Sequence, residues 1–279
     1  MLFAGIDGGQ SGTTAAIGDG TRLLARGTSG AADEIGVTAD STRLRDALES
    51  ALVAALAAAD LPLDSRFDAI VAGVSGYEGH VYGLPPRLPA QRWILMHDAP
   101  IAHAGALGGA PGVVVIAGTG SVAYTVAADG RAKTTGGWGY LFGDEGSAFW
   151  TVRRSIERAI AEGEVRAAPL LAYFNVASLR ELVRAFYSGE ISRDRLASFA
   201  PVALGDDEVA DMSARALAQL AAQAVLERPC SVAFVGGMLR DSSFLQRVHE
   251  RTRGLLPDCE LVEPAAGPAE GALILAQRL

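Results

Sequence analysis

Lysine is almost missing from this chain of 279 residues, in which arginine carries the positive charge and Lys133 is the single lysine. No G-x-x-x-x-G-K-[ST] segment occurs. This excludes a P-loop nucleotide-binding protein, in which a lysine must reach the phosphates. Any phosphate site in this protein must therefore be built from backbone amides, hydroxyl groups and a metal ion.

Cysteine is scarce as well, with Cys230 and Cys259 as the only two. Two cysteines are too few for a disulfide framework, and their spacing matches no metal site. Long apolar runs free of glycine and charge are also missing, so no membrane span is expected. The N-terminus has no basic region and Asp7 interrupts its apolar start, so no signal peptide is expected. We expect a reduced, cytoplasmic protein.

The charge balance excludes further partners. The formal net charge is −8, and a diffuse acidic balance argues against nucleic acid or an anionic membrane as a partner. Half of the residues are apolar, which is enough for a sizeable core.

Two glycine-rich turns, at 4–14 and 115–121, each follow a short apolar run that is typical of a buried strand. Glycine and hydroxyl residues between strands let backbone N–H groups converge on an anion without steric interference. Asp7 adds a carboxylate at the end of the first run, and a carboxylate beside a phosphate site suits a magnesium-bound nucleotide. The pairing indicates an enzyme that uses ATP.

The pattern of apolar runs and breaks predicts an α/β fold with two related domains. Strands are predicted at 2–6, 14–17, 22–26, 69–74, 93–96, 113–116, 121–126, 132–135, 231–235 and 260–262, and helices at 44–59, 99–107, 146–161, 179–186, 208–226, 244–253 and 269–278. Because both halves repeat strand, glycine turn, strand, strand, we expect two domains around a cleft. We place the N-terminal domain at 1–110, joined by the C-terminal helix 267–279, and the C-terminal domain at 111–266.

The most specific string is Gly136–Trp150, which reads GGWGYLFGDEGSAFW. Together with the two glycine turns and Gly236-Gly237, it resembles the sugar-kinase, actin and Hsp70 ATPase superfamily. Within that superfamily the chain resembles the N-acetylglucosamine kinase and BadF/BadG/BcrA/BcrD ATPase family. The resemblance implies two ribonuclease-H-like (actin-like ATPase) domains around an interdomain cleft, with ATP and Mg²⁺ as cofactors and a small sugar as substrate.

The resemblance also implies a role for each matching residue. Asp7 would orient Mg²⁺, and Asp98 would be the general base that takes the proton from the sugar hydroxyl. The nucleotide would be bound by Gly8, Gly9, Ser11, Gly12, Thr13, Gly118, Thr119, Gly120 and Ser121 at its phosphates and by Gly236 and Gly237 at its adenosine. The sugar would be bound by Gly137, Trp138, Gly139 and Asp144.

Several of these residues have an alternative, purely structural interpretation. Asp98 precedes Ala99-Pro100, so it could be a helix N-cap, with or without a catalytic role. Trp138 could be a core residue. His97 is expected to point to the opposite face from Asp98 and to be structural, and Glu145 and Ser147 are expected to cap the helix that follows them.

Asparagine occurs once, as Asn175, which departs from the resemblance. N-acetylglucosamine kinases use an asparagine in the loop that here is 27–34, and can carry another where this chain has Val122. An asparagine both donates and accepts hydrogen bonds, whereas a carboxylate only accepts. The sugar-contacting residues have therefore changed, and glucosamine becomes a candidate if Asp33 or Glu34 meets an amine. The alternative is that both acids lie in a solvated loop.

Two functions follow from the sequence. The first is ATP-dependent phosphorylation of a hexose or amino sugar. The second is a non-catalytic nucleotide- or sugar-binding regulator, or a BadF-type ATPase, of the same fold. The activator ATPases of the family hold an iron–sulfur cluster with cysteines. Neither Cys230 nor Cys259 lies in a suitable glycine loop, so we do not expect this chain to belong to that branch. The oligomeric state, a homodimer included, stays open.

Overall fold

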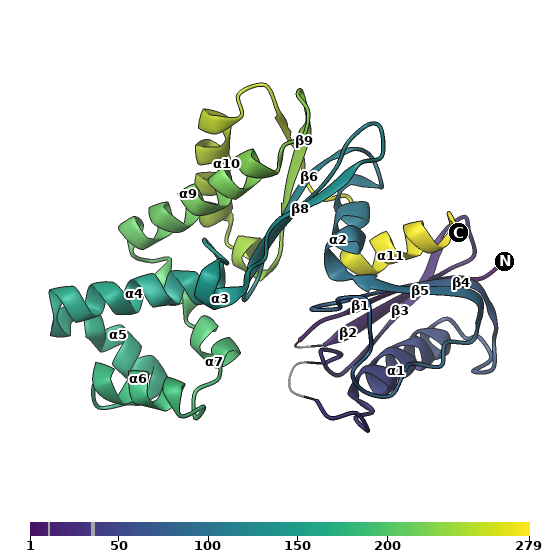
Figure 1. The fold of residues 1–279 in the computed structure, drawn as a ribbon, viewed down its shortest axis with the longest axis horizontal. Coiled ribbons are helices and arrows are strands. Elements are labelled where there is room, and N and C mark those ends of the chain that lie inside the picture. Colours follow the sequence, from purple (N-terminus) through teal and green to yellow (C-terminus); the bar gives the residue numbers. More distant parts are fainter. Residues whose placement is uncertain (11, 35–36) are drawn as a thin grey trace. The chain divides into compact units, whose positions relative to one another are not determined.

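The computed structural model describes residues 1–10, 12–34 and 37–279. They form two compact units: Met1–Pro111 together with Glu263–Leu279, and Gly112–Val262. Each unit contains one five-stranded sheet (Figure 1). The chain enters the second unit at Gly112 and returns to the first at Glu263, so the C-terminal helix belongs to the first unit.

The sheet of the first unit has the strand order β3-β2-β1-β4-β5. Neighbours β1 and β2, and β2 and β3, are antiparallel, whereas β1, β4 and β5 run parallel. Because parallel strands end at the same edge of a sheet, the residues that follow β1, β4 and β5 gather there. The strands are β1 (Phe3–Gly8), β2 (Thr13–Gly18), β3 (Leu23–Ser29), β4 (Phe67–Val74) and β5 (Ala90–His97).

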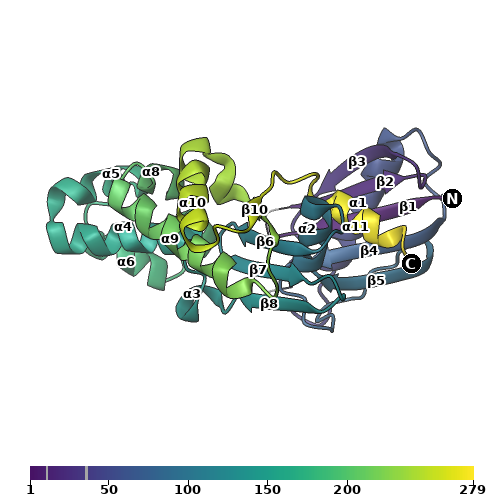
Figure 2. The same ribbon diagram turned by 90° about the horizontal axis from the view of Figure 1, so that it is seen from above.

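Alternating side chains give this sheet an apolar core on each face. On one face Ile6 is fully buried in the cluster that includes the apolar side of α1 (Arg43–Ala58). On the other face Phe3 is buried with residues of α2 (Asp98–Leu107) and α11 (Pro268–Ala276). Helix α11 lies over β1 and β4 (Figure 2).

Glycine residues at the points of contact allow the backbone of α11 to lie directly against β1 and α2. A Cβ atom on Gly5 of β1 would overlap the backbone of Leu273, and one on Gly271 would overlap the carbonyl oxygen of Ile101 in α2. The backbones of β1, α2 and α11 are therefore in direct contact, and any side chain at these positions would force them apart.

The second unit repeats the topology of the first. Its strand order is β10-β9-β6-β7-β8, with β6, β7 and β8 antiparallel and β6, β9 and β10 parallel. The strands are β6 (Gly112–Ala117), β7 (Ser121–Val126), β8 (Ala132–Gly136), β9 (Ser231–Val235) and β10 (Glu260–Leu261). In each sheet three strands form an antiparallel set, and the other two run parallel to the central strand, which is β1 in the first sheet and β6 in the second. The shared topology confirms the predicted pair of related α/β folds.

The helices of the second unit enclose one large core that includes Phe149, Leu217 and Phe234. They are α3 (Gly139–Phe142), α4 (Ala148–Glu162), α5 (Glu164–Phe174), α6 (Leu179–Tyr187), α7 (Arg193–Ala197), α8 (Ala200–Ala203), α9 (Asp207–Ala224), η1 (Gly237–Arg240, a 3₁₀ turn) and α10 (Ser242–Leu255). The sequence patterns did not predict α3, α5, α7, α8 or η1. Nowhere in residues 1–10, 12–34 and 37–279 does a helix have the length and apolar character needed to cross a bilayer.

We predict that Gly5→Ala lowers the free energy of unfolding by about 1–3 kcal/mol or more, because the new methyl group must displace α11 from β1. Urea unfolding of the full chain measures the change. The matched control is Gly30→Ala, where an added Cβ would meet no atom of the described residues within 4 Å. Equal stabilities of the two variants would contradict the proposed contact.

Candidate active site

The first glycine turn joins β1 to β2 and is held by backbone hydrogen bonds. The Gly9 amide donates to the Gly12 carbonyl over 2.9 Å, and the Ala32 amide donates to Gly9 over 3.0 Å. The buried Thr13 hydroxyl donates to the Gly30 carbonyl over 2.8 Å. This hydrogen bond therefore holds the residue that follows β3 beside the start of β2. The predicted phosphate-binding residues Gly8, Gly9, Gly12 and Thr13 lie together in or beside this turn, and Ser11 lies outside the described residues.

Asp7 lies in β1 at the sheet edge where β1, β4 and β5 end. Burial, together with the smaller effects of the negative charges of Asp98 and Glu270, raises the pKa of Asp7 from 3.8 to about 7. Glu270 belongs to α11 and forms an ion pair with Arg26. Within the described residues, the charges that shift the pKa of Asp7 are both negative, so the site holds surplus negative charge.

This surplus charge fits a divalent cation. Among the described residues no group of three or more His, Cys, Asp or Glu side chains is arranged to hold a metal ion alone. Magnesium keeps several of its waters and is bound by one or two carboxylates together with substrate phosphates, so it does not need such a cage. Asp7 has the charge and the position for that role.

Asp98 is the first residue of α2, directly after β5. The N-cap of α2 is His97, whose ring nitrogen Nδ1 accepts from the Ala99 amide over 3.2 Å. The interpretation of Asp98 as the N-cap was therefore wrong, and its carboxylate is not the group that caps the helix. Asp98 thus directly follows β5, which is the strand next but one to β1 in the sheet order, at the same edge as Asp7.

His97 contacts Asp98, which corrects the expectation that it points to the opposite face. Its Nδ1 lies 2.7 Å from Oδ1 of Asp98. The hydrogen bond to Asp98 raises the pKa of His97, burial opposes this, and the charge of Glu78 adds to the rise. Nδ1 accepts from the Ala99 amide when it carries no proton and donates to Asp98 when it does, and in both states His97 is the residue at the N-cap position of α2. The shorter, charge-assisted bond dominates, so His97 restrains the Asp98 carboxylate.

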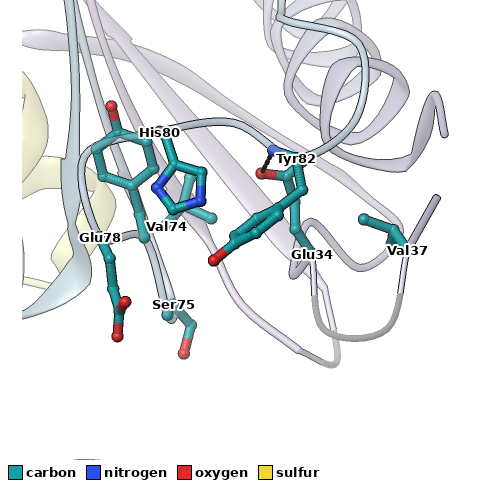
Figure 3. Close-up of a pocket in the computed structure, with 9 residues that line it drawn as sticks. Glu34, Val37, Val74, Ser75, Glu78, His80 and Tyr82 are labelled. Atoms are coloured by element: carbon teal, nitrogen blue, oxygen red, sulfur yellow. Dashed lines mark hydrogen bonds between the residues drawn. The ribbon is translucent and has the colours of Figure 1, made fainter. Parts of the chain in front are cut away.

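A hollow of about 370 Å³ opens beside the loop that follows β4. Figure 3 shows Ser75, Glu78, His80 and Tyr82 around it, with the Glu78 carboxylate and the Ser75 hydroxyl pointing to the same side. The His80 and Tyr82 rings pack edge to face with centroids 4.1 Å apart. The Ser75 amide donates to Gly8 over 2.9 Å, so this loop is tied to the first glycine turn.

The two acids of the loop 27–34 are both engaged within the protein. Glu34 accepts from the Tyr82 amide over 3.0 Å (Figure 3). It also accepts from the Gly83 amide over 2.8 Å, and so holds the wall of the hollow in place. Asp33 is 9% exposed and lies 3.8 Å from a guanidinium nitrogen of Arg43. The interpretation as a solvated loop was wrong for Asp33, which is buried, whereas Glu34 is half-buried and fixes a neighbouring segment.

In the second unit the turn 118–121 is tied to the segment that begins α4. The Gly118 amide donates to Gly120 over 2.9 Å, and the Ala148 amide donates to the Gly118 carbonyl over 2.9 Å. The Phe149 amide donates to Thr119 over 3.3 Å. The predicted phosphate turn therefore cannot move independently of the start of α4.

Asp144 connects this turn to the predicted sugar-binding segment. It is 6% exposed, has a left-handed backbone (φ 58°), and accepts hydrogen bonds from the backbones of Ser121 and Gly139. Burial raises the pKa of Asp144, which these hydrogen bonds oppose. A Cβ on Gly120 would lie 2.7 Å from its Oδ2, and the Ser121 hydroxyl donates to the Glu145 carbonyl over 2.9 Å. Asp144 thus fixes the relative position of the two segments.

The remaining predicted residues differ in how far they are enclosed. Trp138 is 76% exposed, so the alternative that it is a core residue was wrong. Its neighbours Gly137 and Gly139 both have positive φ, at 73° and 78°. Ser147 caps α4 by accepting from the Trp150 amide over 3.3 Å, as predicted, whereas no capping bond by the Glu145 side chain is among the contacts of the described residues.

Gly236 and Gly237 follow β9, at the end of a strand that runs parallel to β6. A Cβ on Gly236, where φ is 114°, would overlap the Ala117 carbonyl, so only glycine fits. A Cβ added to Gly237 would meet no atom within 4 Å in the part of the chain that the structure describes. Backbone exposed in this way leaves room for a flat ligand.

The arrangement of the two sheets is that of the actin-like ATPase fold. Solved structures with this fold include sugar kinases, among them the ROK hexokinase from Thermus thermophilus, at 19% identity over 99% of this chain and 98% of that one, with a TM-score of 0.58. At that identity the likeness shows the actin-like ATPase fold alone.

The model of the BadF/BadG/BcrA/BcrD ATPase family matches residues 4–276, and the chain belongs to this family. The N-acetylmuramic acid/N-acetylglucosamine kinase of Clostridium acetobutylicum is 26% identical over 66% of this chain and 67% of that protein. A crystal structure from Chromobacterium violaceum, provisionally assigned as an N-acetylglucosamine kinase, is 26% identical over 99% of this chain and 98% of its own, with a TM-score of 0.79. These findings confirm the resemblance.

We predict that Asp7→Asn stabilises the metal-free protein at pH 8 and has little effect near pH 4. The folded-state pKa of about 7 exceeds the unfolded value of 3.8. The folded state therefore binds more protons between these values, and stability falls as pH rises through that window. The asparagine variant avoids this loss, which amounts to at most about 4 kcal/mol.

Thermal unfolding with a chelator at several pH values measures the effect, and the exposed Asp64→Asn is the control. Destabilisation by Asp7→Asn at every pH would show that the buried carboxylate is not under electrostatic strain.

Proposed function

We propose that this protein is an ATP-dependent kinase that phosphorylates a hydroxyl group of a hexose or amino sugar. The observation that carries the proposal is the position of Asp98. Its carboxylate is not used to cap α2, it lies on the sheet edge that also carries Asp7, and it contacts His97. The names of the Clostridium and Chromobacterium relatives support the same reaction.

In the proposed reaction Asp98 accepts the proton of the sugar hydroxyl as that oxygen bonds to the γ-phosphorus. His97 holds the carboxylate in place through the 2.7 Å contact. Phosphoryl transfer asks mainly for positioning and charge stabilisation, so one oriented carboxylate is enough as a base. Mg²⁺, when bound, supplies positive charge to the phosphates, and Asp7 is the residue that would hold it.

The nucleotide assignments are part of the same proposal. The first turn, with Gly8, Gly9, Gly12 and Thr13, and the turn 118–121 would each bind phosphate through backbone amides, because the chain has no lysine in either turn. The amides of Gly9 and Gly118 are excepted, since they donate within the turns. Gly236 and Gly237 would lie against the adenosine. The assignment of Gly137, Trp138, Gly139 and Asp144 to the sugar stays a prediction, and the contacts of Asp144 give it a structural role as well.

The hollow beside β4 supports a relaxed requirement for an N-acetyl group. Its wall contains no asparagine, and Glu34 is engaged with backbone amides. Glu78 is the other acid of this wall, and it lies close enough to His97 for its charge to raise the pKa of that residue. We propose that Glu78, in place of Asp33 or Glu34, receives the amino group of an amino sugar.

A second candidate function is ATP hydrolysis without transfer to a sugar, which the name of the family allows. A nucleotide-binding regulator would need no base at Asp98. The Asp98 contacts therefore favour the kinase over the regulator, and product analysis separates the kinase from the ATPase.

We predict that Asp98→Asn lowers kcat about 10²–10⁴-fold and leaves ATP binding nearly unchanged, because the amide keeps the shape but cannot accept the proton. Sugar-dependent ADP release and nucleotide titration measure the two quantities. The control is Asp46→Asn, which also removes an acidic residue from the first turn of a helix in the same unit. Turnover within about tenfold of the parent, near 1.4 kcal/mol, would exclude Asp98 as the base.

We predict that kcat/KM for N-acetylglucosamine exceeds that for glucosamine or glucose by less than about a hundredfold, near 2.7 kcal/mol, because the asparagine contacts are missing. Glu78→Gln should lower kcat/KM for glucosamine about tenfold and leave that for glucose nearly unchanged, since only the amine carries a charge. Glucose is thus the internal control. An equal loss for both sugars would remove Glu78 from amine recognition.

A further inference from the structure

Cys230 and Cys259 are brought together by the pairing of two strands. Cys230 directly precedes β9, and Cys259 directly precedes β10. These strands run parallel with Ser231 opposite Glu260, and the Glu260 amide donates to the Cys230 carbonyl over 2.9 Å. The two cysteines are therefore neighbours across the sheet, and their Sγ atoms lie 2.8 Å apart.

This arrangement suits a covalent bond. Neighbouring strands lie about 4.8 Å apart, which falls within the Cα separations that a disulfide can bridge. Both thiols are free and both residues are only partly buried, so a small oxidant can reach them. We propose that Cys230 and Cys259 form an oxidisable pair that a hydroperoxide converts into an intrachain disulfide.

The reaction balances in two steps. One cysteine loses its proton and its thiolate attacks a peroxide oxygen, so that the O–O bond breaks and a sulfenic acid and one water or alcohol form. The second thiol, as its thiolate, attacks the sulfenic sulfur, and the S–S bond forms as water leaves. The two cysteines together lose two electrons and two protons, and the hydroperoxide is reduced.

The rate of this reaction should depend on pH. Burial and the contact with Cys259 raise the pKa of Cys230 to about 12. Because the thiolate is the reacting form, oxidation accelerates as pH rises above neutrality.

The disulfide would hold a weakly attached segment. Strand β10 has two residues, and it is held to β9 by the Glu260 bond and by the Val262 amide, which donates to Val232 over 3.0 Å. The chain returns to the first unit directly afterwards, at Glu263. The new bond would also close a covalent loop from 230 to 259, which contains β9, Gly236, Gly237 and α10. The oxidised form is therefore expected to resist local unfolding at this edge of the sheet.

The test treats the reduced full chain with hydrogen peroxide. We expect the intact mass to fall by two hydrogen atoms, and peptide mapping without reductant to find Cys230 linked to Cys259. The Tm should rise by roughly 5 °C and return to its starting value with dithiothreitol. The reaction should be faster at pH 9 than at pH 7.

Cys230→Ser and Cys259→Ser are the matched controls, and each should abolish both the mass loss and the rise in Tm. Peptide mapping of the parent decides the question even if a serine variant folds poorly. Sulfinic acids or intermolecular disulfides in place of the Cys230–Cys259 link would overturn the proposal. This inference does not rest on the kinase activity, because the mass and the Tm need no turnover.

Discussion

Negative charge held out of water at the edge of the first sheet is the constraint on which the candidate active site depends. Asp7 is kept there by its place in β1, and its pKa rises to about 7 because it is buried and because Asp98 and Glu270 add charge of the same sign. Without a cation, the Asp7 carboxylate loses its unfavourable charge by taking up a proton. A bound cation would offset the same repulsion. The raised pKa of Asp7 and the metal site that we propose there are thus two consequences of one arrangement.

This arrangement follows from the packing of the C-terminal helix. Gly5 and Gly271 remove the side chains that would separate β1, α2 and α11, and the resulting contact buries the strand that carries Asp7. The same helix brings Glu270 to the site and pairs it with Arg26. Helix α11 is therefore part of the unit that carries Asp7 and Asp98, although it follows the whole second unit in the sequence.

The sequence predicted most of the elements that carry the site, and the failures have physical reasons. Buried strands such as β6 and β9 are short apolar runs that end at a glycine, which a pattern reveals. Helices of four or five residues, such as α3, α7 and α8, are too short to show a period, and α5 contains Pro169. Such helices are fixed by tertiary packing instead.

The candidate site, too, could be predicted from the sequence only in part. The positions of Asp7 and Asp98 at strand ends could be inferred from the run of residues alone. The partners could not, because they depend on the folded chain: Glu34 reaches the amides of Tyr82 and Gly83, and Cys230 meets Cys259 across a strand pair. His97 could have been found from its place beside a predicted base, since an adjacent imidazole is a common partner of a carboxylate.

The central claim is that the phosphoryl group is transferred to a sugar. Phosphorus-31 NMR of the purified chain with ATP, Mg²⁺ and, in turn, glucose, glucosamine and N-acetylglucosamine tests it most directly. The account predicts a sugar-phosphate signal that grows in step with ADP in at least one of the three mixtures. Inorganic phosphate as the only new product beside ADP, or no loss of ATP in any mixture, would contradict it.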